Sequence, residues 1–116
     1  MNEQTPARFR RNTEVRLVEA IACVRRAGQT KESRGRLASV LIVDDERENC
    51  QALGEILGEL GFDTRSVQDG AAALEHVAHR TPDAILLDIG MPGLDGFEVL
   101  SRLRDVHPPT RLPIIM

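Results

Sequence analysis

Apolar residues gather in short runs along residues 37–116, and the segments between the runs are amphipathic. Uninterrupted runs cover residues 40–43 and 84–87, and a third run, broken by one proline, covers residues 112–116. Short apolar runs bounded by polar residues are typical of buried strands, whereas apolar residues spaced three and four apart indicate helices. The alternation of the two patterns predicts an α/β fold, in which helices cover both faces of a parallel sheet.

The expected elements alternate regularly. Strands are predicted at residues 39–43, 62–67, 84–87 and 112–116, and helices at residues 48–60, 69–79 and 97–107. Two of the helices carry apolar stripes that should face the sheet: Leu53, Ile56, Leu57 and Leu60, and then Phe97, Leu100 and Leu103. Asp favours the position before a helix, so Asp69 and Asp95 are expected to cap the second and third helices. The same structural role is open to Asp44 and Asp45 at the first.

Three carboxylates directly follow predicted strands. Asp44 and Asp45 end the first run, and Asp88 ends the run at 84–87. The C-terminal ends of parallel strands meet at one edge of an open α/β sheet, where such folds bind ligands. Three like charges placed this close repel, so the cluster must hold protons or bind a cation, and an all-oxygen site suits Mg²⁺. Beside such a cation, Asp88 could attack phosphorus and become an aspartyl phosphate.

The segments around these carboxylates carry a resemblance to a known family. They are VDDE at 43–46, LLDIGMPGLDG at 86–96 and LPIIM at 112–116. In this order and at this spacing, they resemble the receiver domain of two-component response regulators, over residues 38–116. The resemblance implies a flavodoxin-like, doubly wound parallel sheet with the strand order 2-1-3-4-5.

The resemblance also implies a role for each residue of the site. Asp88 would be the phosphoacceptor and would take a phosphoryl group from a phosphohistidine on a sensor histidine kinase or a phosphotransfer protein. Asp45 and Asp88 would ligate Mg²⁺ directly, and Asp44 would act through a bound water. The main-chain carbonyl of Gly90 would complete the site. Residues 92–96, with one proline and two glycines, resemble the turn that follows the acceptor strand.

The last residue, Met116, falls inside the fourth predicted strand. In the family, a Ser or Thr after this strand and a Lys at the end of the fifth strand contact the phosphoryl group. We therefore expect an incomplete receiver fold of about three and a half βα units. In such a fragment Ile114 and Ile115 should be partly exposed, because helices normally cover both faces of a parallel sheet. An output domain could follow Met116 in the parent protein.

Charge divides the chain at residue 36. Residues 1–36 hold nine Arg or Lys against four Glu, a net of +5, and residues 37–116 hold six Arg against fourteen Asp or Glu, a net of −8, which together give the −3 of the whole chain. We therefore expect a basic N-terminal extension at 1–36 and a partial receiver domain at 37–116. The extension should contain one amphipathic helix from Thr13 to Gly28, followed by a polar linker at 29–36. Its apolar residues recur at helical spacing: Leu17, Val18, Ile21 and Val24.

This helix has three open interpretations. It could dock a partner or dimerise, it could contact nucleic acid through Arg8, Arg10 and Arg11, or it could be a solvated leader. Direct nucleic-acid binding is the least expected, because three Phe and no Trp or Tyr leave few side chains for base stacking. Since no apolar stretch approaches the roughly 20 residues of a membrane span and no signal sequence is recognisable, we expect a cytoplasmic protein without membrane contact.

Two rival functions stay open. A haloacid dehalogenase-like phosphatase also uses an aspartate nucleophile and Mg²⁺, but it needs a second Asp two positions later, where Gly90 stands. The other rival is a phosphorylation-incompetent interaction module that binds a partner through the acidic domain or the basic helix. The expected function is that of a phosphoacceptor module whose only chemistry is self-phosphorylation and self-dephosphorylation at Asp88. It would not be a turnover enzyme.

Overall fold

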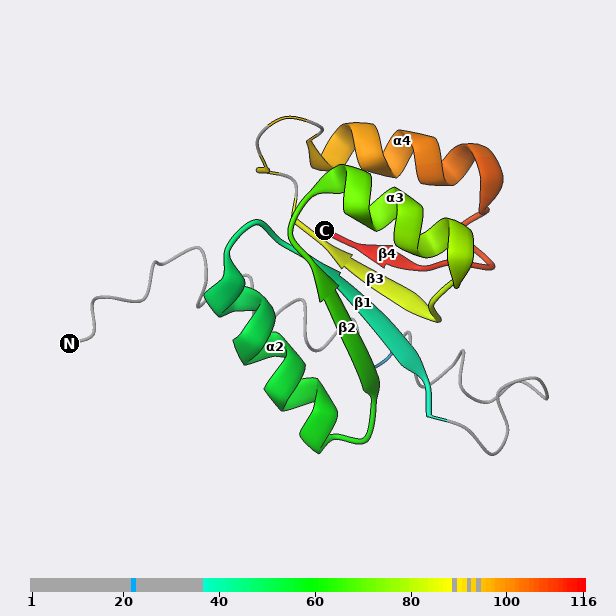
Figure 1. The fold of residues 1–116 in the computed structure, drawn as a ribbon. Helices are drawn as coiled ribbons and strands as arrows, with labels where there is room; N and C mark the ends of the chain where they lie inside the picture. Colours follow the sequence, from blue (N-terminus) through cyan, green and yellow to red (C-terminus); the bar gives the residue numbers. More distant parts are fainter. Residues whose placement is uncertain (1–21, 23–36, 89, 92, 94) are drawn as a thin grey trace.

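The computed structural model describes residues 22, 37–88, 90–91, 93 and 95–116. The predicted extension at 1–36 and its helix therefore lie outside the described residues, except for Ala22, which is helical and exposed. From residue 39 on, strands and helices alternate as predicted (Figure 1). Their bounds are β1 Ser39–Val43, α2 Arg47–Glu59, β2 Asp63–Val67, α3 Gly70–His79, β3 Ala84–Leu87, α4 Gly96–Val106 and β4 Ile114–Ile115.

The described strands form one parallel sheet in the order β2-β1-β3-β4. This is the start of the strand order that the family resemblance implied, and it confirms the predicted doubly wound α/β fold. Val43 of β1 lies opposite Val67 of β2 and opposite Leu87 of β3, so the strands on both sides of β1 end level with it. At the other side of β3, Leu86 pairs with Ile115.

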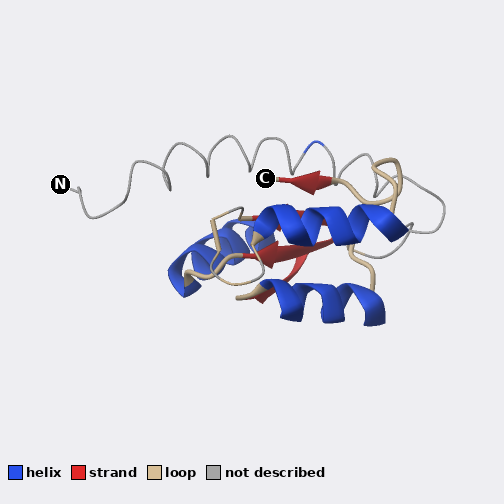
Figure 2. Ribbon diagram, turned by 90° about the horizontal axis from the view of Figure 1, so that it is seen from above, coloured by secondary structure: helices blue, strands red, loops and turns tan. Residues whose placement is uncertain are grey.

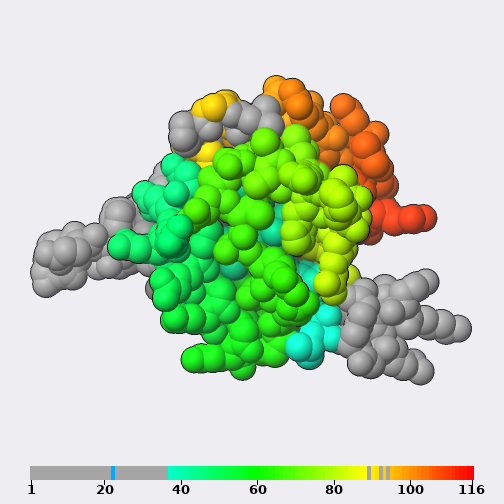
Figure 3. All heavy atoms as spheres, in the orientation of Figure 1, coloured from blue at the N-terminus to red at the C-terminus, as the bar shows by residue number. Residues whose placement is uncertain are grey.

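The helices divide between the two faces of the sheet. On one face α2 packs with Val40 and Ile42. On the other face lie α3 and α4, which run alongside one another in both views of the ribbon (Figures 1 and 2) and cover Leu41 and Ile85. In the space-filling view, α4 borders α3 at the top of the molecule (Figure 3). Among the residues described, no helix combines the length and apolar character that crossing a bilayer needs.

The predicted stripe of α2 is half wrong. Leu53 and Leu57 are fully buried, but Ile56 and Leu60 are 40% and 47% exposed. The third buried position of the helix is Cys50, three residues before Leu53, so the side facing the sheet follows the spacing 50, 53, 57. Each residue turns an α-helix by about 100°, which carries Ile56 to the edge of this buried side.

A similar error affects α4. Phe97 was expected to face the sheet, but it is 61% exposed, and the buried apolar residues are Val99 and Leu103. Leu100 is partly buried against the same core. The apolar pattern therefore predicted the position of the helix in the sequence correctly, but it predicted the wrong side of the first turn to face the sheet.

The predicted caps are confirmed for two helices. The side chain of Asp69 accepts a hydrogen bond from the amide of Ala72 in α3, and that of Asp95 accepts one from the amide of Glu98 in α4. At α2 the N-cap is Glu46, whose side chain makes no capping bond. Neither Asp44 nor Asp45 therefore caps α2.

Ser39 and Asp83 fix the start of β1 beside the segment that leads into β3. The amide of Ser39 donates to Asp83 Oδ2 at 2.7 Å, and the amide of Asp83 donates to Ser39 Oγ at 3.1 Å. These residues are 44 positions apart in the sequence. Their contact helps to fix the register of β1 against β3 at the N-terminal ends of the strands, opposite the edge that carries the carboxylates.

The expected exposure of the last strand is only partly correct. Ile114 is partly buried, as predicted, but Ile115 is 7% exposed and belongs to the core on the α2 side. The prediction that both residues would be partly wet is therefore wrong for Ile115.

Candidate functional site

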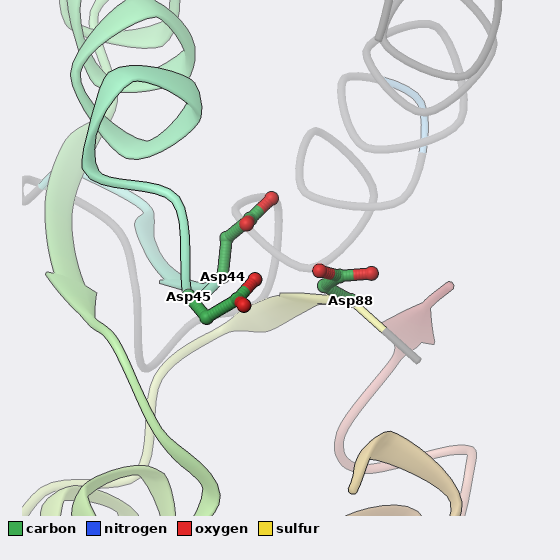
Figure 4. Close-up of side chains that lie close together, drawn as sticks. All are labelled: Asp44, Asp45 and Asp88. Atoms are coloured by element: carbon green, nitrogen blue, oxygen red, sulfur yellow. The ribbon is translucent and has the colours of Figure 1, made fainter. Parts of the chain in front are cut away.

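The three predicted carboxylates meet at one edge of the sheet. Asp44 and Asp45 follow β1 and Asp88 follows β3, and one carboxylate oxygen of each lies within 4.8 Å of the others (Figure 4). The cause is the register of the two strands, because Val43 and Leu87 are partners and the next residues emerge side by side. The amide of Asp88 also donates to the carbonyl of Val43 at 2.9 Å, which extends the pairing to the site itself.

Asp88 is one of the two buried members of this cluster. It is 8% exposed, and its Oδ1 accepts a hydrogen bond from the amide of Gly90 at 3.1 Å. Its Oδ2 is buried, and no described residue forms a hydrogen bond with it. A buried carboxylate oxygen without a partner is costly, because burial removes the water that would solvate it. This oxygen is therefore the atom of the site that a bound cation would stabilise most.

Asp44 is almost fully buried, at 1% exposed, and its two oxygens are engaged by the chain itself. Oδ1 accepts from the amide of Glu46 at 2.9 Å, and Oδ2 accepts from the side-chain amide of Asn49 at 3.2 Å. Asn49 also donates to Glu46 Oε1 at 2.8 Å. The sequence reasoning missed Asn49, although an Asn in the first turn of the helix that follows the acidic pair was an available signal.

Asp45 differs from its neighbour because it is exposed to solvent. The cluster thus combines two buried carboxylates with one that faces water. This donor set contains only oxygen ligands, which suits a hard divalent cation such as Mg²⁺. No other group of three acidic, His or Cys side chains in the described part of the chain comes close enough to share an ion.

Cys50 supports the site from within α2. Its thiol donates to the carbonyl oxygen of Asp44 at 3.3 Å, and the side chain is buried. Burial and the nearby Asp44 carboxylate raise the pKa of the Cys50 thiol above its ordinary value of 9.0. The thiol therefore stays neutral, as expected for a reduced core residue.

The loop after Asp88 is described in part. Gly90 is exposed, and Gly93 has φ +73°, in the left-handed region that glycine enters without strain, as the predicted turn requires. Gly96 begins α4. The proline predicted for this turn, Pro92, lies outside the described residues.

The sequence and the fold both match known proteins. The family model of the response regulator receiver domain matches residues 40–116. Response regulator MprA from Mycobacterium sp. (strain KMS) is 40% identical over 77 residues, which cover 66% of this chain and 33% of MprA. Response regulator PleD from Caulobacter vibrioides is 37% identical over 79 residues, or 68% of this chain and 17% of PleD. The chain thus spans about a third or less of these relatives.

Among solved structures, response regulator protein TrrA from Thermotoga maritima, in complex with Mg²⁺-BeF, superposes with a TM-score of 0.63. It is 32% identical, and the superposition covers 69% of this chain and 68% of TrrA. A receiver domain with a CheY-like fold from Methylobacillus flagellatus gives a TM-score of 0.58 at 31% identity, over 60% of this chain and 59% of that protein.

Proposed function

The chain belongs to the family of response regulator receiver domains, and from this premise we propose that Asp88 accepts a phosphoryl group from a phosphohistidine of a partner kinase. The observation that supports the assignment to Asp88 is its buried Oδ2, which lies in a cluster of three carboxylates and has no hydrogen-bond partner among the described residues. An oxygen without hydrogen bonds keeps its lone pairs available for attack on phosphorus. Asp44 is a poorer nucleophile, because the chain hydrogen-bonds both of its oxygens.

The transfer is a displacement at phosphorus. A carboxylate oxygen of Asp88 forms the new O–P bond while the P–N bond to the imidazole breaks, and the electron pair of that bond stays on the ring nitrogen. Hydrolysis of the acyl phosphate by water would then release phosphate and restore the carboxylate. The phosphoryl group on Asp88 would be the signal, and its hydrolysis would return the protein to the unphosphorylated state. The chain would therefore act as a switch and not as a turnover enzyme.

The same cluster fits Mg²⁺. Asp45 and Asp88 would ligate the ion with the main-chain carbonyl of Gly90, and Asp44 would act through a water, in keeping with its two engaged oxygens. When bound, Mg²⁺ would offset the negative charge of the phosphoryl group among three carboxylates. TrrA, which was solved with Mg²⁺-BeF, supports this choice of ion.

The partners follow from the family. A sensor histidine kinase or a phosphotransfer protein would supply the phosphoryl group. An output domain would read the state of Asp88, in line with relatives that are longer than this chain.

Acetyl phosphate tests the proposal without a partner kinase. The full chain is incubated with acetyl phosphate and Mg²⁺, and its intact mass is measured, with circular dichroism to establish folding. We expect one added phosphoryl group, no addition to Asp88→Asn, and no addition when EDTA removes the metal. The matched control, Asp105→Asn, removes an exposed carboxylate of α4 and should be labelled like the parent chain.

Two outcomes would overturn the proposal. Labelling that persists in Asp88→Asn would assign the phosphoryl group to another residue. A folded parent chain that never accepts a phosphoryl group would favour the interaction module that binds partners without phosphorylation.

A further inference from the structure

Asn49 connects two of the acidic residues around the site. Its side-chain amide donates to Asp44 Oδ2 at 3.2 Å and to Glu46 Oε1 at 2.8 Å. Asp44 is buried and Glu46 is exposed, so the amide links a carboxylate of the cluster to one at the surface. The next residue of α2, Cys50, is buried in the core and donates to the carbonyl oxygen of Asp44. This turn of the helix is therefore fixed beside the site.

The carboxylate of Asp44 is held through both of its oxygens. Oδ2 accepts the hydrogen bond from Asn49, and Oδ1 accepts one from the main-chain amide of Glu46 at 2.9 Å. The backbone of Glu46 is fixed in turn, because its carbonyl accepts a hydrogen bond from the amide of Cys50 at 3.2 Å. A carboxylate attached through both oxygens cannot turn them towards one ion unless a hydrogen bond breaks. Loss of Asn49 would remove this restraint on Oδ2.

The freedom of this carboxylate bears on the choice of ion. Ca²⁺ takes about six to eight oxygen ligands and often chelates a carboxylate through both oxygens. Mg²⁺ is smaller, needs near-octahedral geometry and usually keeps several waters. An Asp44 that cannot rotate therefore withholds oxygens from Ca²⁺, whereas it costs Mg²⁺ little, because water fills the remaining positions.

We propose that Asn49 makes the carboxylate cluster selective for Mg²⁺ over Ca²⁺, because it keeps Asp44 from chelating the ion through both oxygens. Asn49 is a positioning residue in this account, since it acts on the ion only through Asp44. The inference rests on the proposed binding of a divalent cation by Asp45 and Asp88. It does not depend on phosphoryl transfer.

A purely structural role for Asn49 leads to a different expectation. Asn49 is the third residue of α2, and its hydrogen bond to the side chain of Glu46 could simply stabilise the start of the helix. Its replacement would then loosen the whole cluster and weaken the binding of both ions by the same factor. The ratio of the two affinities distinguishes the roles, because a general loss of stability cancels in the ratio.

Displacement of Mn²⁺ measures this ratio. Mn²⁺ is bound to the full chain, Mg²⁺ or Ca²⁺ is titrated in, and the released Mn²⁺ is followed by electron paramagnetic resonance. We expect Asn49→Ala to raise the affinity for Ca²⁺ relative to Mg²⁺ by at least about fivefold, the scale of one hydrogen bond to a charged group. The matched control, Gln51→Ala, truncates an exposed side chain of the same helix and should leave the ratio within about twofold.

A second variant covers the case in which Asn49→Ala unfolds the chain. Asn49→Leu removes the donor but keeps a side chain of similar size, and it should shift the ratio in the same direction, with circular dichroism to establish folding. An unchanged ratio in either folded variant would overturn the role of Asn49 and leave the proposed metal site intact. A folded parent chain that binds none of the three ions would overturn the metal site itself, and this inference with it.

Discussion

Replacing Asp88 with asparagine should stabilise the protein when divalent cations are absent. The amide has almost the shape of the carboxylate, and its oxygen can still accept the hydrogen bond from the amide of Gly90. It removes one of three negative charges and can place an N–H at the position of Oδ2, which no described residue hydrogen-bonds. The substitution therefore removes both the repulsion that Asp88 adds to the cluster and the cost of its buried Oδ2 when no metal is bound.

The magnitude follows from the spacing of the charges. Two unit charges 4.8 Å apart, the limit of separation in this cluster, repel by about 3.5 kcal/mol at an effective dielectric constant of 20. Salt and the exposure of Asp45 reduce its share, so we expect a gain of about 1–3 kcal/mol in the free energy of unfolding. Each kcal/mol should raise the melting temperature by about 4–8 °C in a domain of this size.

Mg²⁺ should reverse this order of stability. At 100 times its dissociation constant, an ion that binds only the folded state stabilises it by about 2.7 kcal/mol, and Asp88→Asn should lose this gain with its ligand. Urea unfolding in EDTA and in Mg²⁺ measures both effects, and Asp105→Asn on exposed α4 should stay within about 0.5 kcal/mol of the parent chain. A lower stability of Asp88→Asn than of the parent in EDTA, or equal stabilisation of both proteins by Mg²⁺, would contradict this prediction.

Three further predictions concern the scaffold. Leu53→Ala, at a fully buried position, should lower the free energy of unfolding by about 2–5 kcal/mol, whereas Ile56→Ala on the exposed edge of α2 should cost less than about 1 kcal/mol in the same urea titration. The raised pKa of Cys50 contributes stability that is fully present below the ordinary value of 9.0 and is lost as the pH rises from there towards the folded-state pKa. The free energy of unfolding should therefore fall more between pH 7 and pH 10 for the parent chain than for Cys50→Ala. An equal fall in the two proteins would contradict the assignment. Asp95→Ala should lower the melting temperature through a loss of about 1 kcal/mol, because the amide of Glu98 loses its cap, and Asp95→Asn, which keeps an acceptor oxygen, should restore most of it.

The strands and the carboxylate cluster were predictable because they depend on patterns that lie within the sequence. A continuous apolar run such as 84–87 is typical of a strand buried on both faces, so the run itself predicted a buried strand, and the family resemblance supplied its place in the sheet. Once both acid-bearing strands were parallel neighbours, the convergence of Asp44, Asp45 and Asp88 required no further information. The caps at Asp69 and Asp95 were equally local.

The remaining features depend on rotation and on distant contacts. Ile56 and Phe97 are as apolar as their buried neighbours, and only the packed position of each helix decides that they face water. The two hydrogen bonds that distinguish Asp44 from Asp88 depend on Asn49 and the amide of Glu46 in the turn leading into α2. The burial of Ile115 depends on whatever covers β3 and β4, which its own short strand does not specify.

The separation of the carboxylates along the chain has a kinetic consequence. Asp44 and Asp88 come together only when β1 has paired with β3, a contact that must close a loop of about 44 residues before any hydrogen bond rewards it. A partly folded chain that has formed α2, α3 or the β1–β2 pair still has no complete acidic cluster. If the cluster binds a divalent ion as proposed, a refolding chain should acquire this binding at the rate at which its central strands assemble. A metal-sensitive signal would then report the slow, non-local step of folding.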